Sequence, residues 1–214
     1  MLRFAIAVLM TIVPPTVAHA QPLPATAVPA PAPQNTLVQV RMETSQGPIV
    51  LALDSGRAPV TTGNFLRYID QKRLDGTSFY RALKVAGWPD LGFIQGGTRN
   101  DPKRVLPPIA HEPTSVTGLS HQAGTISMAR YAPGSANGDF FITLGAMPSM
   151  DAQASGEGDL AGFAAFGTVV EGMDIVRKIL GQPTSPTEGE GVMRGQMLSP
   201  VVQILTVRRV TPVK

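Results

Sequence analysis

Apolar and polar residues alternate at the start of the region that follows residue 36. The stretch LVQVRME, which begins at Leu37, has an apolar side chain at every second position from Val38, as a strand with one buried face does. Residues 45–47 (SQG) favour a turn, and residues 48–53 are almost entirely apolar. The pattern therefore predicts a β-hairpin over residues 37–53.

Two other segments have the spacing of an amphipathic helix. The first begins at Pro59, a residue favoured in the first helical turn, and places Phe65 and Ile69 on one face. The second covers residues 173–180, where apolar side chains recur at three-residue intervals before Gly181 ends the pattern. The sequence thus predicts two helices among a larger number of extended segments.

Further strands are predicted where short apolar runs lie between turn residues. These are residues 78–82, 93–95, 124–129, 140–143, 165–170 and 201–210. With the hairpin they make eight strands, and strands and helices do not alternate along the chain. Closure removes the exposed edges of such a sheet. The predicted fold class is therefore mainly β, a closed eight-stranded antiparallel barrel capped by two helices.

The N-terminal 36 residues differ from the rest. Arg3, the apolar run 4–13 and the ending Ala18-His19-Ala20 form the pattern of a signal peptide over residues 1–20, which predicts export to a periplasm. The run is half the length needed to span a bilayer, so no stable membrane insertion is expected after cleavage. Residues 21–36 contain five prolines and are expected to form an extended linker, followed by one domain over residues 37–214.

Composition excludes several kinds of site. The chain has no cysteine, which rules out disulfides, zinc–thiolate sites and a thiol nucleophile. The formal net charge is +3, and the basic residues are scattered along the chain, so no nucleic-acid partner is expected. Apolar residues make up 43% of the chain, enough for a buried core.

Three ordered groups of residues carry a family resemblance. The first is SFYR at residues 78–81 followed by IQGG at 94–97, which is similar to F-H-R … Q-G-G. The second is GTISMA at 124–129 leading to GDFFI at 138–142, and the third is FAAFGTV at 163–169 followed by EGMD. In this order and at these spacings the chain resembles the cyclophilins over about residues 38–210.

The resemblance implies a peptidyl-prolyl cis-trans isomerase that acts on proline-containing unfolded or extended polypeptide segments, as an exported folding enzyme and a monomer. Arg81 matches the catalytic arginine and Gln95 the glutamine that orients the substrate carbonyl. The substrate-binding positions implied are Phe93, Met128, Ala129, Arg130, Phe141, Met150 and Phe163. No metal or cofactor is implied.

Physical chemistry agrees with these roles. The peptide C–N bond resists rotation with a barrier of roughly 18–20 kcal/mol, and rotation returns a lone pair to the prolyl nitrogen. A cationic donor aimed at that nitrogen and an apolar wall around the ring should both lower the barrier. A hydrogen bond to a charged group is worth about 1.5–3 kcal/mol, or ten- to a hundredfold in rate.

The chain departs from the family pattern between Arg81 and Gln95, where residues 84–91 form an insertion. Gly92 consequently stands where a pocket phenylalanine is usual. Phe93 is favoured as its substitute over Trp88, which stands beside a proline in a predicted loop, although Phe93 could instead point into the core. Asp139 replaces a glutamine of the binding groove.

Histidines and acids offer little further chemistry in sequence. His111 and His121 stand in a connection rich in Pro, Gly and Ser, and are expected to be solvated or bonded to the backbone. No Ser/His pairing is evident, which disfavours a hydrolase. Asp151, Glu157 and Asp159 are expected in a solvated loop rather than at a cation site. Arg81 and Gln95 favour an enzyme, whereas Gly92 and Asp139 favour the alternative, a non-catalytic chaperone module that binds proline segments.

Overall fold

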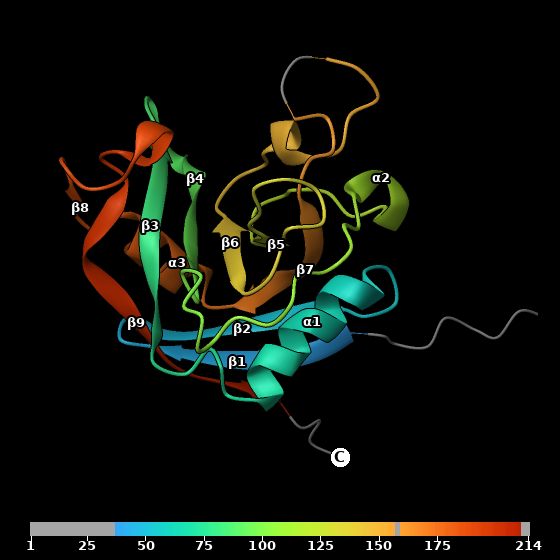
Figure 1. The fold of residues 1–214 in the computed structure, drawn as a ribbon. Coiled ribbons are helices and arrows are strands. Elements are labelled where there is room, and N and C mark those ends of the chain that lie inside the picture. The colour runs from blue at the N-terminus through green and yellow to red at the C-terminus, as the bar shows by residue number, and fades with distance from the viewer. Residues whose placement is uncertain (1–36, 157–158, 211–214) are drawn as a thin grey trace, which may run out of the picture. The chain divides into compact units, whose positions relative to one another are not determined.

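The computed structural model describes residues 37–156 and 159–210 (Figure 1). The predicted signal peptide and linker lie outside the described residues. The predicted hairpin is present as β1 (Leu37–Thr44) and β2 (Gly47–Asp54), paired antiparallel with Leu37 opposite Asp54.

Eight strands close into an antiparallel barrel, as predicted. Their order is β1-β2-β7-β5-β6-β4-β3-β9, and β9 pairs with β1 to complete the ring. A ninth strand, β8, adds only two residues beside β9. The bounds are β3 Thr77–Val85, β4 Trp88–Gly97, β5 Thr125–Met128, β6 Asp139–Thr143, β7 Ala164–Glu171, β8 Thr184–Ser185 and β9 Met197–Arg209.

Both predicted helices are present, α1 over Pro59–Asp70 and α3 over Met173–Leu180. The first turn of α1 is capped from a distant segment, because the carboxylate of Glu112 accepts the backbone N–H groups of Val60 and Thr61 at 3.0 and 2.6 Å. Three short helical elements were not predicted: α2 (Thr114–Thr117) and the 3-10 helices Pro148–Met150 and Gly191–Met193.

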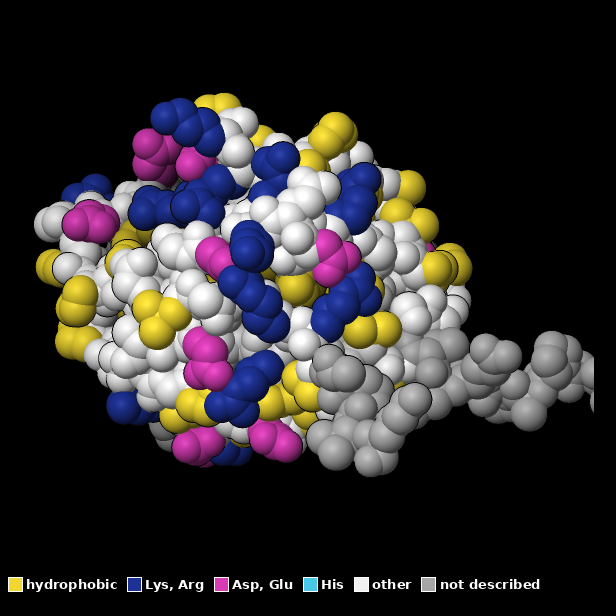
Figure 2. All heavy atoms as spheres, turned by 90° about the horizontal axis from the view of Figure 1, so that it is seen from below, with side chains coloured by type: hydrophobic (Ala, Val, Ile, Leu, Met, Phe, Trp, Pro, Cys, Tyr) yellow, Lys and Arg dark blue, Asp and Glu magenta, His cyan; other side chains and the backbone are white. Residues whose placement is uncertain are grey.

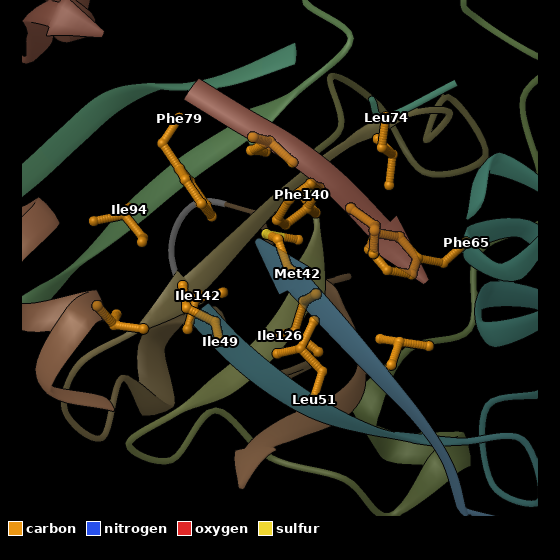
Figure 3. Close-up of a cluster of buried hydrophobic side chains, with 14 of the residues drawn as sticks. Met42, Ile49, Leu51, Phe65, Leu74, Phe79, Ile94, Ile126, Phe140 and Ile142 are labelled. Carbon is orange, nitrogen blue, oxygen red and sulfur yellow. The ribbon is translucent and has the colours of Figure 1, made fainter. Parts of the chain in front are cut away.

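The core fills the barrel with side chains from alternate strand positions and from α1 (Figure 3). The ring of Phe140 lies between those of Phe65 and Phe79, with centroid distances of 5.3 and 5.7 Å in edge-to-face contact. Each such buried side chain stabilises the fold by roughly 1.5–3 kcal/mol. The interior of the barrel is therefore filled with packed side chains.

The insertion at residues 84–91 is a strand extension, so the predicted loop is wrong. Val85 pairs with Trp88 across a tight turn, and the next register pair is Lys84 with Gly92. The three residues between Trp88 and Gly92 have no partners in that register and form a bulge. Gly92 has φ +150°, and a Cβ there would lie 2.1 Å from the Leu83 carbonyl oxygen, so only glycine fits.

Charged side chains of both signs are interspersed on the face seen in Figure 2. Among the ion pairs of the described residues, two tie the end of β9 to the segment around the end of α1. Arg208 pairs with Asp75 and Arg209 with Asp70, each at 2.7 Å.

Candidate active site

A cavity of about 430 Å³ opens on the outer face of β3, β4 and β6. Eight of the nine predicted site residues line it: Arg81, Phe93, Gln95, Ala129, Arg130, Phe141, Met150 and Phe163. Several lining residues were not predicted: Tyr80, Arg99, Asn100, Asn137, Val192, Met193 and Met197. The barrel thus brings together residues that are more than a hundred positions apart in sequence.

Met128 is the exception, and its predicted contact with substrate is corrected. Its side chain is buried in the core together with that of Ile126, two positions earlier on β5. Because successive side chains of a strand point to opposite faces, Met128 shares the inward face with Ile126. The neighbouring Ala129 lines the cavity instead.

A β-bulge in β3 aims two successive side chains at the cavity. Phe79 pairs with Gly96 and Arg81 with Gln95, so Tyr80 is an extra residue on this strand. Phe79 and Ala82 point into the core, and both Tyr80 and Arg81 line the cavity between them. Bulges commonly re-aim side chains in this way beside functional sites.

The Arg81 guanidinium is held by neutral partners. Nη1 donates to Oε1 of Gln95 and Nε donates to Oε1 of Gln196, both at 2.9 Å. No carboxylate within residues 37–156 and 159–210 forms an ion pair with it. Burial lowers the pKa of Arg81, yet a guanidinium remains protonated in proteins. The cavity therefore contains a cation whose charge is not neutralised by a salt bridge.

Aromatic side chains form an apolar wall beside this cation. The Phe141 ring packs against Phe93 at 5.3 Å and against Phe163 at 5.4 Å between centroids. The Arg81 guanidinium lies 5.0 Å from the centroid of Phe93. Phe93 lines the cavity while the next residue, Ile94, enters the core. Trp88 is 66% exposed and does not line the cavity. Phe93 is therefore the aromatic residue that takes the place of the pocket phenylalanine missing at position 92.

Comparison with known proteins identifies the family. Residues 39–208 match the family described as cyclophilin type peptidyl-prolyl cis-trans isomerase/CLD. The chain belongs to the cyclophilin family. The enzyme class predicted from the ordered motifs, a peptidyl-prolyl cis-trans isomerase, is thereby confirmed.

Individual relatives agree with this assignment. The chain is 36% identical over 155 residues to a peptidyl-prolyl cis-trans isomerase of Acinetobacter baylyi, covering 71% of this chain and 75% of that protein. It is 35% identical over 147 residues to peptidyl-prolyl cis-trans isomerase B of Escherichia coli, with coverage of 68% and 85%. A solved cyclophilin-type isomerase of Cryptosporidium parvum shares the fold, with a TM-score of 0.64, 19% identity and coverage of 83% and 99%.

In this cyclophilin a polar chain continues from Arg81 to a buried acid. Gln95 accepts from Arg81 and donates from Nε2 to the Tyr80 hydroxyl at 2.9 Å, and Tyr80 in turn bonds to the side chain of Asp139. Oδ1 of Asp139 also accepts the backbone N–H of Arg99 at 2.8 Å. Burial raises the pKa of Asp139, although these donors oppose the shift. The buried carboxylate of Asp139 therefore helps to hold Tyr80 at the cavity.

Arg130 lines the cavity as predicted, and its guanidinium also has partners within the protein. Its side chain is almost fully buried, forms an ion pair with Asp159 at 2.6 Å, and lies 4.9 Å from the Phe163 ring centroid. Nε also donates to the Gly162 carbonyl at 3.0 Å. The guanidinium is thus occupied in holding the segment before Phe163 against the cavity.

The prediction for the histidines is right for His111 and wrong for His121. His111 Nε2 lies 3.0 Å from the backbone carbonyl oxygen of Ala161. His121 is fully buried, with Nδ1 2.6 Å from Oδ1 of Asp151 and Nε2 2.9 Å from Oγ of Ser127. A Ser/His pairing therefore exists, and Asp151, whose side chain is 21% exposed, contacts the histidine of that pair. Nothing local in the sequence reveals a contact between positions 121 and 151.

Two further findings concern the described part of the chain. It contains no group of three or more His, Asp or Glu side chains arranged to hold a metal ion. None of its helices is long and apolar enough to cross a membrane. Glu157, one of the acids considered in sequence, lies outside the described residues.

Proposed function

We propose that Arg81 catalyses rotation about X-Pro bonds by donating a hydrogen bond to the prolyl nitrogen. Rotation breaks amide resonance, so that nitrogen becomes a better acceptor in the transition state than in either ground state. A donor that binds the nitrogen only then lowers the barrier. The observation that carries this proposal is the un-neutralised Arg81 guanidinium beside the Phe93 ring.

The aromatic wall is proposed to hold the proline ring. At the cavity, Phe93 and Phe141 are almost fully buried and Phe163 is partly buried. None of these side chains has a hydrogen-bond donor that could compete with Arg81. Exclusion of water lowers the local dielectric constant and thereby strengthens the hydrogen bond from Arg81, because electrostatic interactions are stronger at a lower dielectric constant. One charge-assisted bond supplies about ten- to a hundredfold in rate, and desolvation by the wall supplies the remainder.

Gln95 is proposed to orient both partners. Its Oε1 fixes the Arg81 guanidinium, and its Nε2 can exchange the Tyr80 hydroxyl for the carbonyl oxygen of a bound peptide. The exchange replaces one hydrogen bond by another of similar strength, so it needs little free energy. Gln95 would then align the client carbonyl while holding the donor in place.

The decisive experiment compares turnover of a proline-containing tetrapeptide by the wild-type chain and two arginine variants. Arg81→Ala should abolish most of the acceleration. Arg41→Ala is a matched control, because Arg41 is half exposed on β1 and pairs only with Glu43 among the ion pairs of the described chain. Peptide binding without any acceleration by the wild type would instead support the non-catalytic chaperone module.

Clients are proposed to be extended, proline-containing segments of exported proteins. Export is inferred from Arg3, the apolar run 4–13 and the Ala18-His19-Ala20 ending. N-terminal sequencing of protein from a periplasmic extract should then begin at Gln21. Recovery of a membrane-bound form that retains Met1 would refute export and leave the isomerase proposal untouched.

A further inference from the structure

His121 does not line the cavity beside Arg81, but it contacts three segments that surround that cavity. Its backbone N–H and its ring Nδ1 both approach Oδ1 of Asp151, at 3.0 and 2.6 Å. Its carbonyl oxygen accepts the backbone N–H of Met147 at 2.8 Å. The segment that contains the 3-10 helix Pro148–Met150 is therefore fastened to His121 at both ends.

The other side of the imidazole is fixed to β5 and β6. Nε2 lies 2.9 Å from Oγ of Ser127, which stands opposite Phe141 in the β5–β6 register. The imidazole is stacked on the Phe141 ring, with centroids 5.8 Å apart and an interplanar angle of 13°. Phe141 therefore has the cavity on one side and His121 as its support.

The fastened segment contributes directly to the cavity. Met150, which precedes Asp151, lines it, and its carbonyl oxygen accepts the backbone N–H of Phe163 at 2.9 Å. A displacement of Asp151 would thus move Met150 and, through that bond, Phe163. Together with Phe141, these residues make up most of the apolar wall.

The order Ser127–His121–Asp151 has the connectivity of a hydrolytic triad, but its surroundings exclude that role. Both Ser127 and His121 have no exposed surface, and neither lines the cavity. A nucleophilic hydroxyl must reach a substrate carbonyl in a productive geometry. The buried Oγ of Ser127 has no such access, so this hydrogen-bond chain must act through what it holds.

We propose that His121 is a positioning residue of the isomerase site, which sets the shape of the proline pocket by fixing Phe141 and Met150 relative to each other. The proposal rests on the function proposed above. It assigns the carboxylate of Asp151 to the Nδ1–H of the imidazole and the Nε2 lone pair to the Ser127 hydroxyl, which donates. Among the described residues, Asp151 is the charged side chain that contacts the His121 ring.

The test compares His121→Gln with His111→Gln, a matched change at the histidine whose ring, among the described residues, has one side-chain hydrogen bond, to the backbone carbonyl of Ala161, and which should keep kcat/KM within about twofold. Turnover of the tetrapeptide Ala-Ala-Pro-Phe gives kcat and KM per folded molecule. The ¹³C-methyl resonance of Met150 reports the pocket, since neighbouring rings shift it, and that of Met42 in the core reports the fold. We expect kcat/KM to fall about tenfold in His121→Gln, with a moved Met150 resonance and an unmoved Met42 resonance.

A purely structural histidine would give a different result. The variant would then have a lower Tm, but each folded molecule would keep kcat/KM within about twofold and an unchanged Met150 resonance, which would overturn the proposal. Should His121→Gln fail to fold, Ser127→Ala and Asp151→Asn each disturb one partner and are judged by the same criteria. If the wild-type chain has no isomerase activity, the proposed function fails. The Met150 resonances of the wild type and His121→Gln, compared during titration with the peptide, still decide whether His121 shapes the pocket.

Discussion

Arg81 and Gln95 face each other across β3 and β4, and Nη1 of the arginine donates to Oε1 of the glutamine at 2.9 Å. This register pair explains how a flexible arginine becomes a directed donor. The glutamine and Gln196 restrict the guanidinium without neutralising it. A carboxylate in either position would offset the charge that the proposed mechanism uses.

Replacing Arg81 should separate activity from stability. Arg81→Ala removes a charge-assisted hydrogen bond, so kcat/KM should fall at least about tenfold while Tm changes little. Arg81→Lys keeps the charge but loses the forked geometry, and an intermediate rate is expected. Isomerisation assays and thermal unfolding of both variants check this. Parallel losses of activity and stability would indicate a structural arginine.

The substitute for the missing pocket phenylalanine can be tested by paired variants. Phe93→Ala removes a ring that lines the cavity and contacts Phe141, so kcat/KM should fall at least about tenfold, with a stability loss of about 1.5–3 kcal/mol. Trp88→Ala should change neither quantity, because Trp88 is largely exposed and outside the cavity. A loss of turnover on replacing Trp88 would show that the β3–β4 extension binds the substrate.

Patterns that depend on neighbouring residues were predicted well from the sequence. Period-two alternation located the hairpin at Leu37, helical spacing gave α3 with its observed bounds, and the ordered motifs placed Arg81 beside Gln95. All of these signals come from residues close together in the chain or from a family pattern that spans it.

Contacts between distant segments were missed for a physical reason. His121 meets Asp151, and Arg81 meets Gln196, only because the barrel closes, and no local period records such meetings. The inward face of Met128 could have been found, because it follows from alternation with Ile126. The β3–β4 extension was missed because Trp88 stands beside a proline, which favours a loop, whereas the bulge leaves residue 89 without a partner in the register.

Asp139 should destabilise the fold at neutral pH. Burial raises its pKa, so the native state binds this proton more tightly than the unfolded chain does. Stability from this group is therefore greatest below the ordinary carboxyl pKa of 3.8 and falls as the pH rises through the native pKa. Asp139→Asn should raise Tm at pH 7, and the gain should shrink in acid. A gain that is independent of pH would contradict this account.

His121 should make the fold sensitive to mild acid in the opposite sense. Burial lowers its pKa below the ordinary value of 6.5, although Asp151 opposes the shift. The unfolded chain then binds the proton more readily, so stability is complete above pH 6.5 and decreases as the pH falls towards the native pKa. Denaturant unfolding at several pH values should show the wild type losing its advantage over His121→Gln in that range. A constant difference between the two would show that His121 does not titrate there.

Arg99 should bias the choice of client. Its side chain is exposed at the cavity, 5.0 Å from the Tyr80 ring centroid, and it forms no ion pair within the described ranges. The nearby Asp139 is buried and already accepts bonds from Tyr80 and the backbone of Arg99, so the accessible charge at this end of the cavity is positive. An exposed charge pair contributes about 0.2–1 kcal/mol, which corresponds to at most about fivefold in kcat/KM.

Peptides that differ only in Glu or Lys next to the proline should therefore be turned over at different rates by the wild type, with Glu preferred by about two- to fivefold at low salt. Arg99→Glu should reverse the preference, whereas Arg41→Glu, on the distant strand β1, should leave it unchanged. Added salt should reduce both the preference and its reversal, because the charges are exposed to solvent. Equal turnover of the two peptides by the wild type at low salt would show that client choice is set by the apolar wall and not by Arg99.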